Sequence, residues 1–262
     1  MTDRTATTAA PIDTAELEAK VVAIYEAVAE NPGGDFHFEL GRALAERLGY
    51  PPPVLDRVPA GAVESFAGVG YFFDLADVRE GEVVVDLGSG SGMDVFVAAV
   101  TVGPTGRVTG VDMTPAQLAK AERLRTAAGF EQATFAHGHI DALPLPDASV
   151  DAVISNGVIN LAADKRRVFA EAARVLRAGG RLAIADIVAE TELTPQIVAN
   201  TDLWASCIGG AAQTDAYQQA IAAAGLDLVT MRRNDYRFLS EQARAAGERF
   251  GVHSVSLLAR KR

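Results

Sequence analysis

Short apolar runs and stretches with one apolar face alternate along the chain from about residue 82 onward. The apolar runs indicate buried strands at residues 83–85, 106–111, 133–136, 150–155, 181–188, 226–232 and 254–258. The one-sided stretches predict helices from residue 93 to about 100 and at residues 114–128, 164–176, 195–206 and 215–224. This alternation predicts an α/β, Rossmann-like fold with a mostly parallel sheet and helices on both faces.

The first 78 residues show a different pattern. Residues 1–11 are small and polar, and we expect them to be disordered. Apolar spacing predicts a helix from Asp13 or Thr14 to Glu30, and further helices at residues 38–48 and 60–66, separated by proline and glycine. We interpret residues 1–78 as a tail and a helical lid over a domain that spans residues 79–262.

A glycine-rich turn follows the first predicted strand. Gly88, Gly90 and Gly92 alternate with other residues behind Asp86. A dinucleotide-binding loop, G-x-G-x-x-G, would need a glycine where this chain has Met93. The order G-x-G-x-G behind an acid instead resembles the first motif of the S-adenosylmethionine (SAM)-dependent methyltransferases. The resemblance implies a class I methyltransferase fold with a seven-stranded sheet, and SAM as the cofactor.

That resemblance also implies cofactor contacts. Gly88, Ser89 and Gly90 would surround the methionine part of SAM, with Asp86 near its amino group. Ligands of an open parallel sheet lie beyond the carboxyl ends of the strands. Asp112 follows the loop by about twenty residues, the place of an acid that binds both ribose hydroxyls. Further contacts at these strand ends are expected from Met113, Gln117, His139, Ile140, Asp141 and Asn156.

Composition narrows the classes of function. The formal net charge is -10, which disfavours nucleic acid as a partner, because phosphate binding needs clustered Lys and Arg. No apolar run reaches the ~20 residues of a membrane span, and no signal peptide is evident, so we expect a cytoplasmic protein. Cys207 is the single cysteine, which excludes an intrachain disulfide.

Several uncommon motifs between about residues 62 and 211 resemble the arsenite methyltransferase family. They are SFAGVGYFFDL, VDLGSGSG, VGPTGRVTGVDMT, ISNGVINL, RVLRAGGRL and LWASCIGGA, in that order. The family binds trivalent arsenic through cysteine thiolates. Cys207 keeps one of these thiols, whereas Val69 and Gly157 stand where the resemblance places two others. Soft metalloid centres are held by several thiolates, and one thiol cannot chelate.

We interpret the chain as a SAM-dependent methyltransferase whose small-molecule acceptor is unidentified, with no resident metal. Candidate catalytic residues are Cys207, Asn156, Tyr25 and His37. Tyr25 matches a family tyrosine near SAM, where a ring face can stabilise the sulfonium. His37 is a candidate base. Two alternatives stay open: arsenite methylation through Cys207 with external thiols, and SAM binding without catalysis. A nicotinamide oxidoreductase is disfavoured by Met93, and the oligomeric state is not determined.

Overall fold

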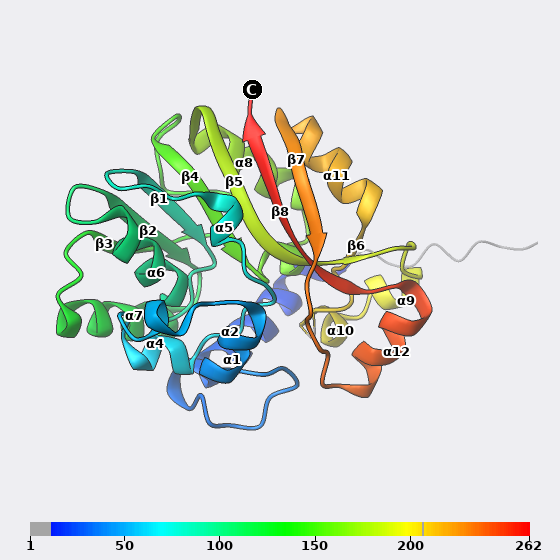
Figure 1. Cartoon of the computed structure of the whole chain (residues 1–262). Coiled ribbons are helices and arrows are strands. Elements are labelled where there is room, and N and C mark those ends of the chain that lie inside the picture. The colour runs from blue at the N-terminus through cyan, green and yellow to red at the C-terminus, as the bar shows by residue number, and fades with distance from the viewer. Residues whose placement is uncertain (1–11, 206) are drawn as a thin grey trace, which may run out of the picture.

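The computed structural model of the chain describes residues 12–205 and 207–262. A single sheet runs through the molecule in the order β3-β2-β1-β4-β5-β8-β7, and the short strand β6 pairs with β5 to make it eight-stranded (Figure 1). All these strands are parallel to their neighbours except β8, which is antiparallel to β5 and β7. The bounds are β1 Val83–Leu87, β2 Arg107–Asp112, β3 Ala133–His137, β4 Val150–Asn156, β5 Leu176–Ala189, β6 Ala212–Gln213, β7 Leu226–Arg233 and β8 His253–Lys261.

Helices cover both faces of the sheet. Successive side chains of a strand point to opposite faces, so strands that are apolar throughout need cover on both sides. One face packs against α8 (Lys165–Val175) and α11 (Thr214–Ala223). The other packs against α6 (Met93–Val102) and the N-terminal segments, with α12 (Glu241–Phe250) at its far end (Figure 1). Successive residues of β1 divide accordingly, since Val84 belongs to one apolar cluster and Val85 to the other. The predicted α/β fold is confirmed, with β6 as an additional short strand.

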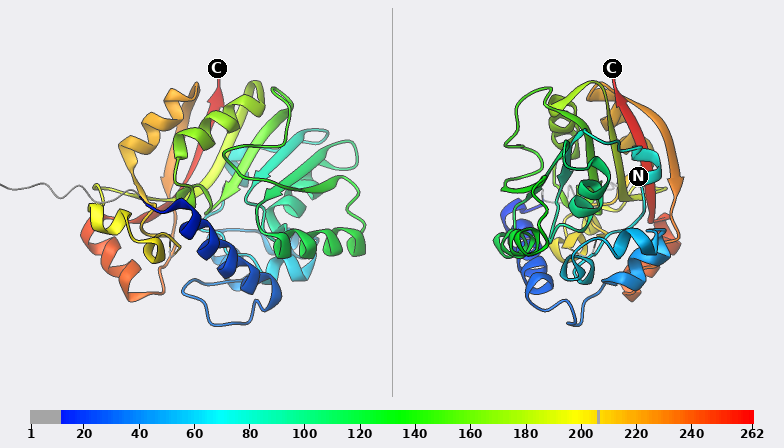
Figure 2. Two further views of the ribbon diagram at one scale, coloured as in Figure 1. Left: turned by 180° about the vertical axis from the view of Figure 1, so that it is seen from behind. Right: turned by 60° about the vertical axis from the view of Figure 1, so that its left-hand side comes forward.

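The N-terminal part forms α1 (Thr14–Glu30), α2 (Arg42–Leu48), α3 (Pro52–Leu55), α4 (Ala60–Glu64) and α5 (Phe73–Ala76). The Asp13 carboxylate caps α1 by accepting hydrogen bonds from Ala15 N and Glu16 N, as predicted. From behind, α1 lies as a dark-blue helix across the lower part of the molecule, below the strands (Figure 2). Leu44, Tyr50 and Phe72 belong to the same cluster of buried side chains as Phe96 of α6. The N-terminal segments therefore share the core of the sheet.

Some predicted boundaries are wrong. The helix expected at residues 38–48 begins only at Arg42, because Gly41 at its N-cap has a φ of 86°. The helix expected to reach residue 176 ends at Val175, where the chain passes directly into β5. Residues 195–205 form two short helices, α9 (Pro195–Val198) and α10 (Thr201–Ala205). The expected disorder of residues 1–11 concerns residues outside those described.

Three further helices went unpredicted. The proline run at residues 51–53 begins α3, because proline fits the first turn of a helix, where an N–H has no partner. The short helix α5 was also missed. So was α12, although the Ser240 hydroxyl caps it by accepting from Ala243 N. The helix α5 has only four residues, too few to show a helical period, and alanine occupies most of the apolar positions of α12. No helix among the described residues is long and apolar enough to cross a membrane.

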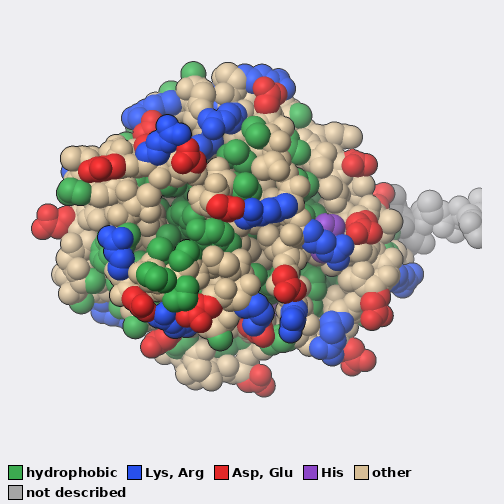
Figure 3. Space-filling model, viewed as in Figure 1, with side chains coloured by type: hydrophobic (Ala, Val, Ile, Leu, Met, Phe, Trp, Pro, Cys, Tyr) green, Lys and Arg blue, Asp and Glu red, His purple; other side chains and the backbone are tan. Residues whose placement is uncertain are grey.

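One buried ion pair ties the segment before β1 to the centre of the sheet. The Arg181 guanidinium on β5, 7% exposed, donates to Glu82 Oε1 at 2.9 Å and to Asp77 O at 2.8 Å, and also to Ala76 O. Most other ion pairs lie on the surface, where basic and acidic side chains are interspersed over the face in Figure 3. Exposed pairs of this kind contribute little to stability.

We expect Arg181→Ala to lower the free energy of unfolding by about 3–5 kcal/mol, because it leaves the Glu82 carboxylate and two carbonyls without their buried donor. Chemical denaturation monitored by circular dichroism measures this. Arg79→Ala, which removes the exposed partner of Asp77, is the matched control and should change stability little. Equal stability of the two variants would contradict the assignment.

Candidate active site

A cavity of about 450 Å³ lies at the carboxyl ends of β1, β2, β3 and β4. Its floor comes from the residues that follow these strands, including Gly88, Met113, Gly138 and Val158. Residues of α1 and of the segment 65–68 form further walls. The cavity is therefore enclosed between the sheet edge and the N-terminal segments, at the position where open parallel sheets bind ligands.

The glycine loop gives this cavity its shape. Gly88, Gly90 and Gly92 all have positive φ, at 69°, 52° and 91°. A Cβ on Gly88 would lie 2.4 Å from Val158 Cγ2, so only glycine fits there. A Cβ on Gly90 would meet nothing nearer than Gln117 Oε1 at 3.7 Å. The backbone at Gly90 is thus open to a ligand at close range, as a nucleoside-binding loop requires.

Asp112 joins that loop to the end of β2. Its Oδ2 accepts from Gly90 N at 2.8 Å, and its Oδ1 accepts from Thr114 N at 2.8 Å. Burial raises the pKa of this carboxyl, and hydrogen bonds from Gly90, Thr114 and Met113 lower it only in part. Asp112 also lines the cavity, so its carboxylate lies where it can accept from donors of a ligand, such as ribose hydroxyls.

Two more acids line the cavity beside the loop. Asp86, 2% exposed, has no hydrogen-bond partner among the described residues, and burial raises its pKa well above the usual range. Asp94, in the first turn of α6, accepts from the Tyr50 hydroxyl at 2.6 Å and from Asn156 Nδ2 at 3.1 Å. Burial nevertheless raises the pKa of Asp94 to about 6.

These acids have no basic partner in the cavity, since none of its described lining residues is Lys or Arg. A buried carboxylate is costly unless a cation or hydrogen-bond donors compensate it. Asp86 has no such compensating group among the described residues. These acceptors fit SAM, whose ammonium and sulfonium are cationic and whose ribose presents two hydroxyl donors.

The remaining cofactor candidates also line the cavity: Ser89, Met113, Gln117, His139, Ile140 and Asp141. The buried Ser89 hydroxyl has no partner in the described structure and can bond a ligand. Gln117 is used within the protein, because Nε2 donates to Tyr25 O at 2.8 Å and Oε1 accepts from the Ser91 hydroxyl. It therefore holds α1 over the loop. His139 Nε2 lies 3.8 Å from Oε1 of Glu18, a residue of α1.

The candidate catalytic residues separate into two groups. Tyr25 and Asn156 line the cavity. Asn156 is saturated, since its amide donates to Tyr50, Asp94 and Gly70 and accepts from Val69 N and Gly70 N. These contacts position the chain around Asn156, and the expectation that it holds substrate or the amino acid part of SAM stays a prediction.

His37 and Cys207 are not among the lining residues. His37 packs edge-on against Phe38 at 4.6 Å between ring centroids, and burial lowers its pKa. Cys207 has a φ of 60°, and burial beside Asp186 raises the pKa of its thiol to about 12. The thiol is therefore protonated at neutral pH. These two expectations of a direct catalytic role are not supported by the geometry.

The two positions that lack the family's thiols touch each other. A Cβ on Gly157 would lie 3.2 Å from Val69 Cγ1, and Asn160 Nδ2 donates to Gly157 O at 3.2 Å. The Asn160 side chain also lies beside the Cys207 thiol, where it partly lowers the thiol pKa. The structure thus brings positions 69, 157 and 207 into one neighbourhood. Among the described residues, no group of three or more His, Cys, Asp or Glu could hold a metal ion.

Several lining residues were missed from the sequence: Thr14, Leu17, Glu18, Val21, Ser65, Phe66, Gly68, Asp94, Val158 and Leu161. The N-terminal helices were expected to form a lid, but the apolar spacing of α1 did not show which of its residues face the cavity, since a helix that covers a cavity and one that covers a core show the same spacing. Asp94 carried a signal, as an acid in the first turn of an otherwise apolar helix.

Comparison with known proteins identifies the family of the chain. A family model described as a methyltransferase domain matches residues 79–225. The chain is 40% identical to an arsenite methyltransferase of Halobacterium salinarum over 203 residues, which cover 78% of this chain and 52% of that protein. It is 43% identical to human arsenite methyltransferase over 137 residues, which cover 49% of this chain and 36% of that protein. The chain thus spans about half or less of these curated relatives.

Two solved structures extend the comparison. An arsenic(III) S-adenosylmethionine methyltransferase from Chlamydomonas reinhardtii superposes with a TM-score of 0.62 at 32% identity, covering 84% of this chain and 73% of that one. A geranyl diphosphate C-methyltransferase from Streptomyces coelicolor superposes with a TM-score of 0.66 at 17% identity, over 97% and 100% of the two chains, and shows the fold alone. The chain therefore belongs to the methyltransferase-domain family, with the fold and the cofactor pocket of the SAM-dependent methyltransferases and a sequence similar to arsenite methyltransferases.

Proposed function

We propose that this protein transfers a methyl group from SAM to a small-molecule acceptor other than arsenite. The observation that carries the proposal is the cavity at the sheet edge, in which an open glycine backbone and buried carboxylates without a cation lie together. Membership of the methyltransferase-domain family supports the same reaction.

Each part of the cavity has a task toward the cofactor. Asp86 would bind the ammonium of SAM, and the loop from Gly88 to Gly90 its methionine part. Asp112 would bind the ribose hydroxyls, while Ile140 and Asp141 lie at the strand end expected to hold the adenine. When bound, SAM supplies the electrophilic methyl group, so the protein contributes orientation, electrostatics and exclusion of water.

The N-terminal segments would act as a lid. Leu17 and Val21 of α1 are buried and line the cavity, and they form an apolar cluster with Leu161 and Trp204. Tyr25 lies on the same helix, and its backbone oxygen is held by Gln117 below. Closure of these residues over the cofactor would keep water from the transferring methyl.

The acceptor is the less determined part. Arsenite is the second candidate, because relatives named for that activity are 40% and 43% identical over the aligned regions. Against it, Val69 and Gly157 offer no thiolate, and the thiol of the half-buried Cys207 is protonated at neutral pH. A lone thiol holds a trivalent metalloid weakly and orients it poorly.

We expect Asp112→Ala to weaken SAM binding by about 1–3 kcal/mol, because the ribose and the Gly90 amide lose their buried acceptor. Isothermal titration calorimetry with SAM measures the change. Asp141→Ala, which removes a partly exposed carboxylate of the same cavity, should have a smaller effect. Unchanged affinity in Asp112→Ala would refute the ribose assignment.

We expect Leu17→Asp to loosen the lid, since it introduces a carboxylate into an apolar cluster at a side chain that is 4% exposed. SAM affinity should fall about ten-fold or more, measured by the same titration. Ala23→Asp places the same charge on an exposed position of α1 and serves as the control. The lid proposal is wrong if both variants bind SAM like the native chain.

We expect slow methylation of arsenite by the native chain, and faster methylation by the double variant Val69→Cys/Gly157→Cys. The second substitution must overcome a left-handed φ of 73°, at a cost of about 1–2 kcal/mol. Arsenite turnover with SAM and glutathione is compared among the native chain, Cys207→Ala and the double variant. Val69→Ser/Gly157→Ser controls for shape without thiols.

Efficient arsenite turnover by the native chain, lost in Cys207→Ala, would favour the second candidate over the first. Turnover that rises equally in the cysteine and serine double variants would show that pocket shape, and not the thiols, limits the reaction.

A further inference from the structure

Tyr50 lies outside the cofactor cavity but is hydrogen-bonded to two residues that line it. The residue lies between α2 and α3, is 1% exposed and does not line the cavity. Its hydroxyl donates to Asp94 Oδ1 at 2.6 Å and accepts from Asn156 Nδ2 at 3.0 Å. Asp94 and Asn156 do line the cavity. One buried hydroxyl therefore connects the N-terminal part to two residues of the site.

Asn156 extends this connection to a wall of the cavity. Its Oδ1 accepts from Val69 N at 2.8 Å, and its Nδ2 donates to Gly70 O at 3.0 Å. A Cβ on Gly68 would lie 2.6 Å from Asn156 Nδ2, so the backbone passes directly over the amide. The segment 68–70 thus rests on the Asn156 side chain, and Gly68 lines the cavity.

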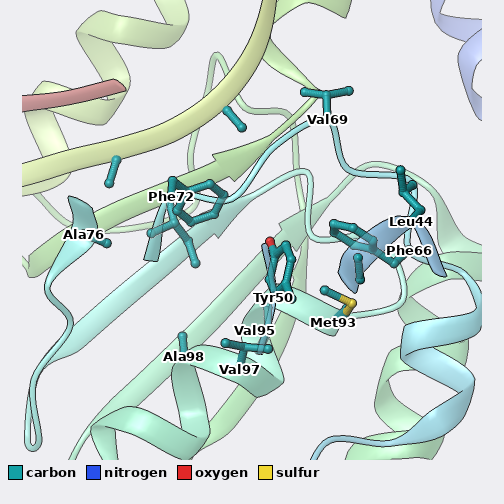
Figure 4. Close-up of a cluster of buried hydrophobic side chains, with 14 of the residues drawn as sticks. Leu44, Tyr50, Phe66, Val69, Phe72, Ala76, Met93, Val95, Val97 and Ala98 are labelled. Carbon is teal, nitrogen blue, oxygen red and sulfur yellow. The ribbon is translucent and has the colours of Figure 1, made fainter. Parts of the chain in front are cut away.

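The ring of Tyr50 is held independently of its hydroxyl. It packs edge-on against Phe66 at 5.2 Å and Tyr71 at 4.9 Å between centroids. Figure 4 shows the ring within the apolar cluster, in view between Phe72 and Phe66, with Met93 and Val95 also drawn there. Replacing the residue by phenylalanine would keep this packing and remove only the polar contacts.

We propose that Tyr50 is a positioning residue for cofactor binding. Its hydroxyl bonds to both Asp94 and Asn156, and it thereby fixes the Asp94 carboxylate and the wall segment 68–70 in the positions at which they face bound SAM. The inference rests on the proposed function, because it assumes that SAM occupies this cavity. It assigns a role to a residue that touches neither cofactor nor substrate.

The hydroxyl also affects the ionisation of Asp94. The groups facing that carboxyl are Tyr50, Asn156 of β4, Asp86 of β1 and Tyr71. Tyr50 and Asn156 donate to the ionised form and favour it, whereas burial opposes it. Loss of the Tyr50 donor therefore raises the pKa of Asp94. A cationic ligand binds the ionised carboxylate better, so its affinity should then begin to fall at a higher pH on acidification.

The test is titration of SAM without acceptor between pH 5.5 and 8.5, for the native chain, Tyr50→Phe and Tyr71→Phe. Tyr71→Phe is the matched control, because that ring contacts Tyr50 and no hydrogen bond of its own hydroxyl is found in the described structure. In Tyr50→Phe we expect the Kd at pH 7.5 to rise about ten-fold and the loss of affinity on acidification to begin about one pH unit higher. Tyr71→Phe should stay within about two-fold of the native Kd.

A double-mutant cycle with Asp94→Asn separates positioning from stability. We expect Tyr50→Phe to weaken SAM binding far less in the Asp94→Asn background than in the native one. The inference is overturned if Tyr50→Phe matches Tyr71→Phe in Kd and in pH dependence, or if its effect is fully additive with Asp94→Asn. If the native chain itself fails to bind SAM, the proposed function falls and this inference with it.

Discussion

The burial of negative charge beside a glycine loop is the constraint on which the site depends. Asp86, Asp94 and Asp112 are each at most 9% exposed, and no Lys or Arg among the described residues lines their cavity. Such charges are tolerated only with donors around them. Backbone amides supply them to Asp112, and Tyr50 and Asn156 supply them to Asp94. Asp86 has no such donor among the described residues, and we propose that the SAM ammonium supplies one.

Hydrogen bonds to residues of the cavity also join the N-terminal segments to the sheet domain. Tyr50 donates to Asp94 at the start of α6, and Gln117 of α7 (Pro115–Ala128) donates to the Tyr25 carbonyl. The same segments bury Leu44, Phe66 and Phe72 against α6. The N-terminal segments are thus held by apolar packing and by polar contacts to residues that line the cavity.

The surroundings of Cys207 bear on the choice between the two proposed acceptors. Val69 and Gly157 pack against each other, where the sequence resemblance places two thiols. Asn160 links this contact to Cys207, and its own amide is held by Asp186 at 2.8 Å. A valine methyl and a glycine provide an apolar surface at that point. Neither residue provides a thiolate for a trivalent metalloid.

Local pattern determined the framework of this protein. The apolar runs gave the strands, because a parallel sheet buries both faces, and the glycine spacing with Asp86 and Asp112 placed the cofactor site at the strand ends. Only the tertiary structure decided which side chains are free to act. Asn156 and Gln117 are hydrogen-bonded to other protein groups, and His37 and Cys207 are not among the residues that line the cavity, although Cys207 packs against lining residues. Hydrogen-bond partners that are far apart in the sequence, such as Tyr50 and Asp94, produce no periodic pattern of residues from which the bond could be predicted. That is the physical reason why a strand end can be predicted from residues alone, whereas the saturation and burial of its side chains cannot.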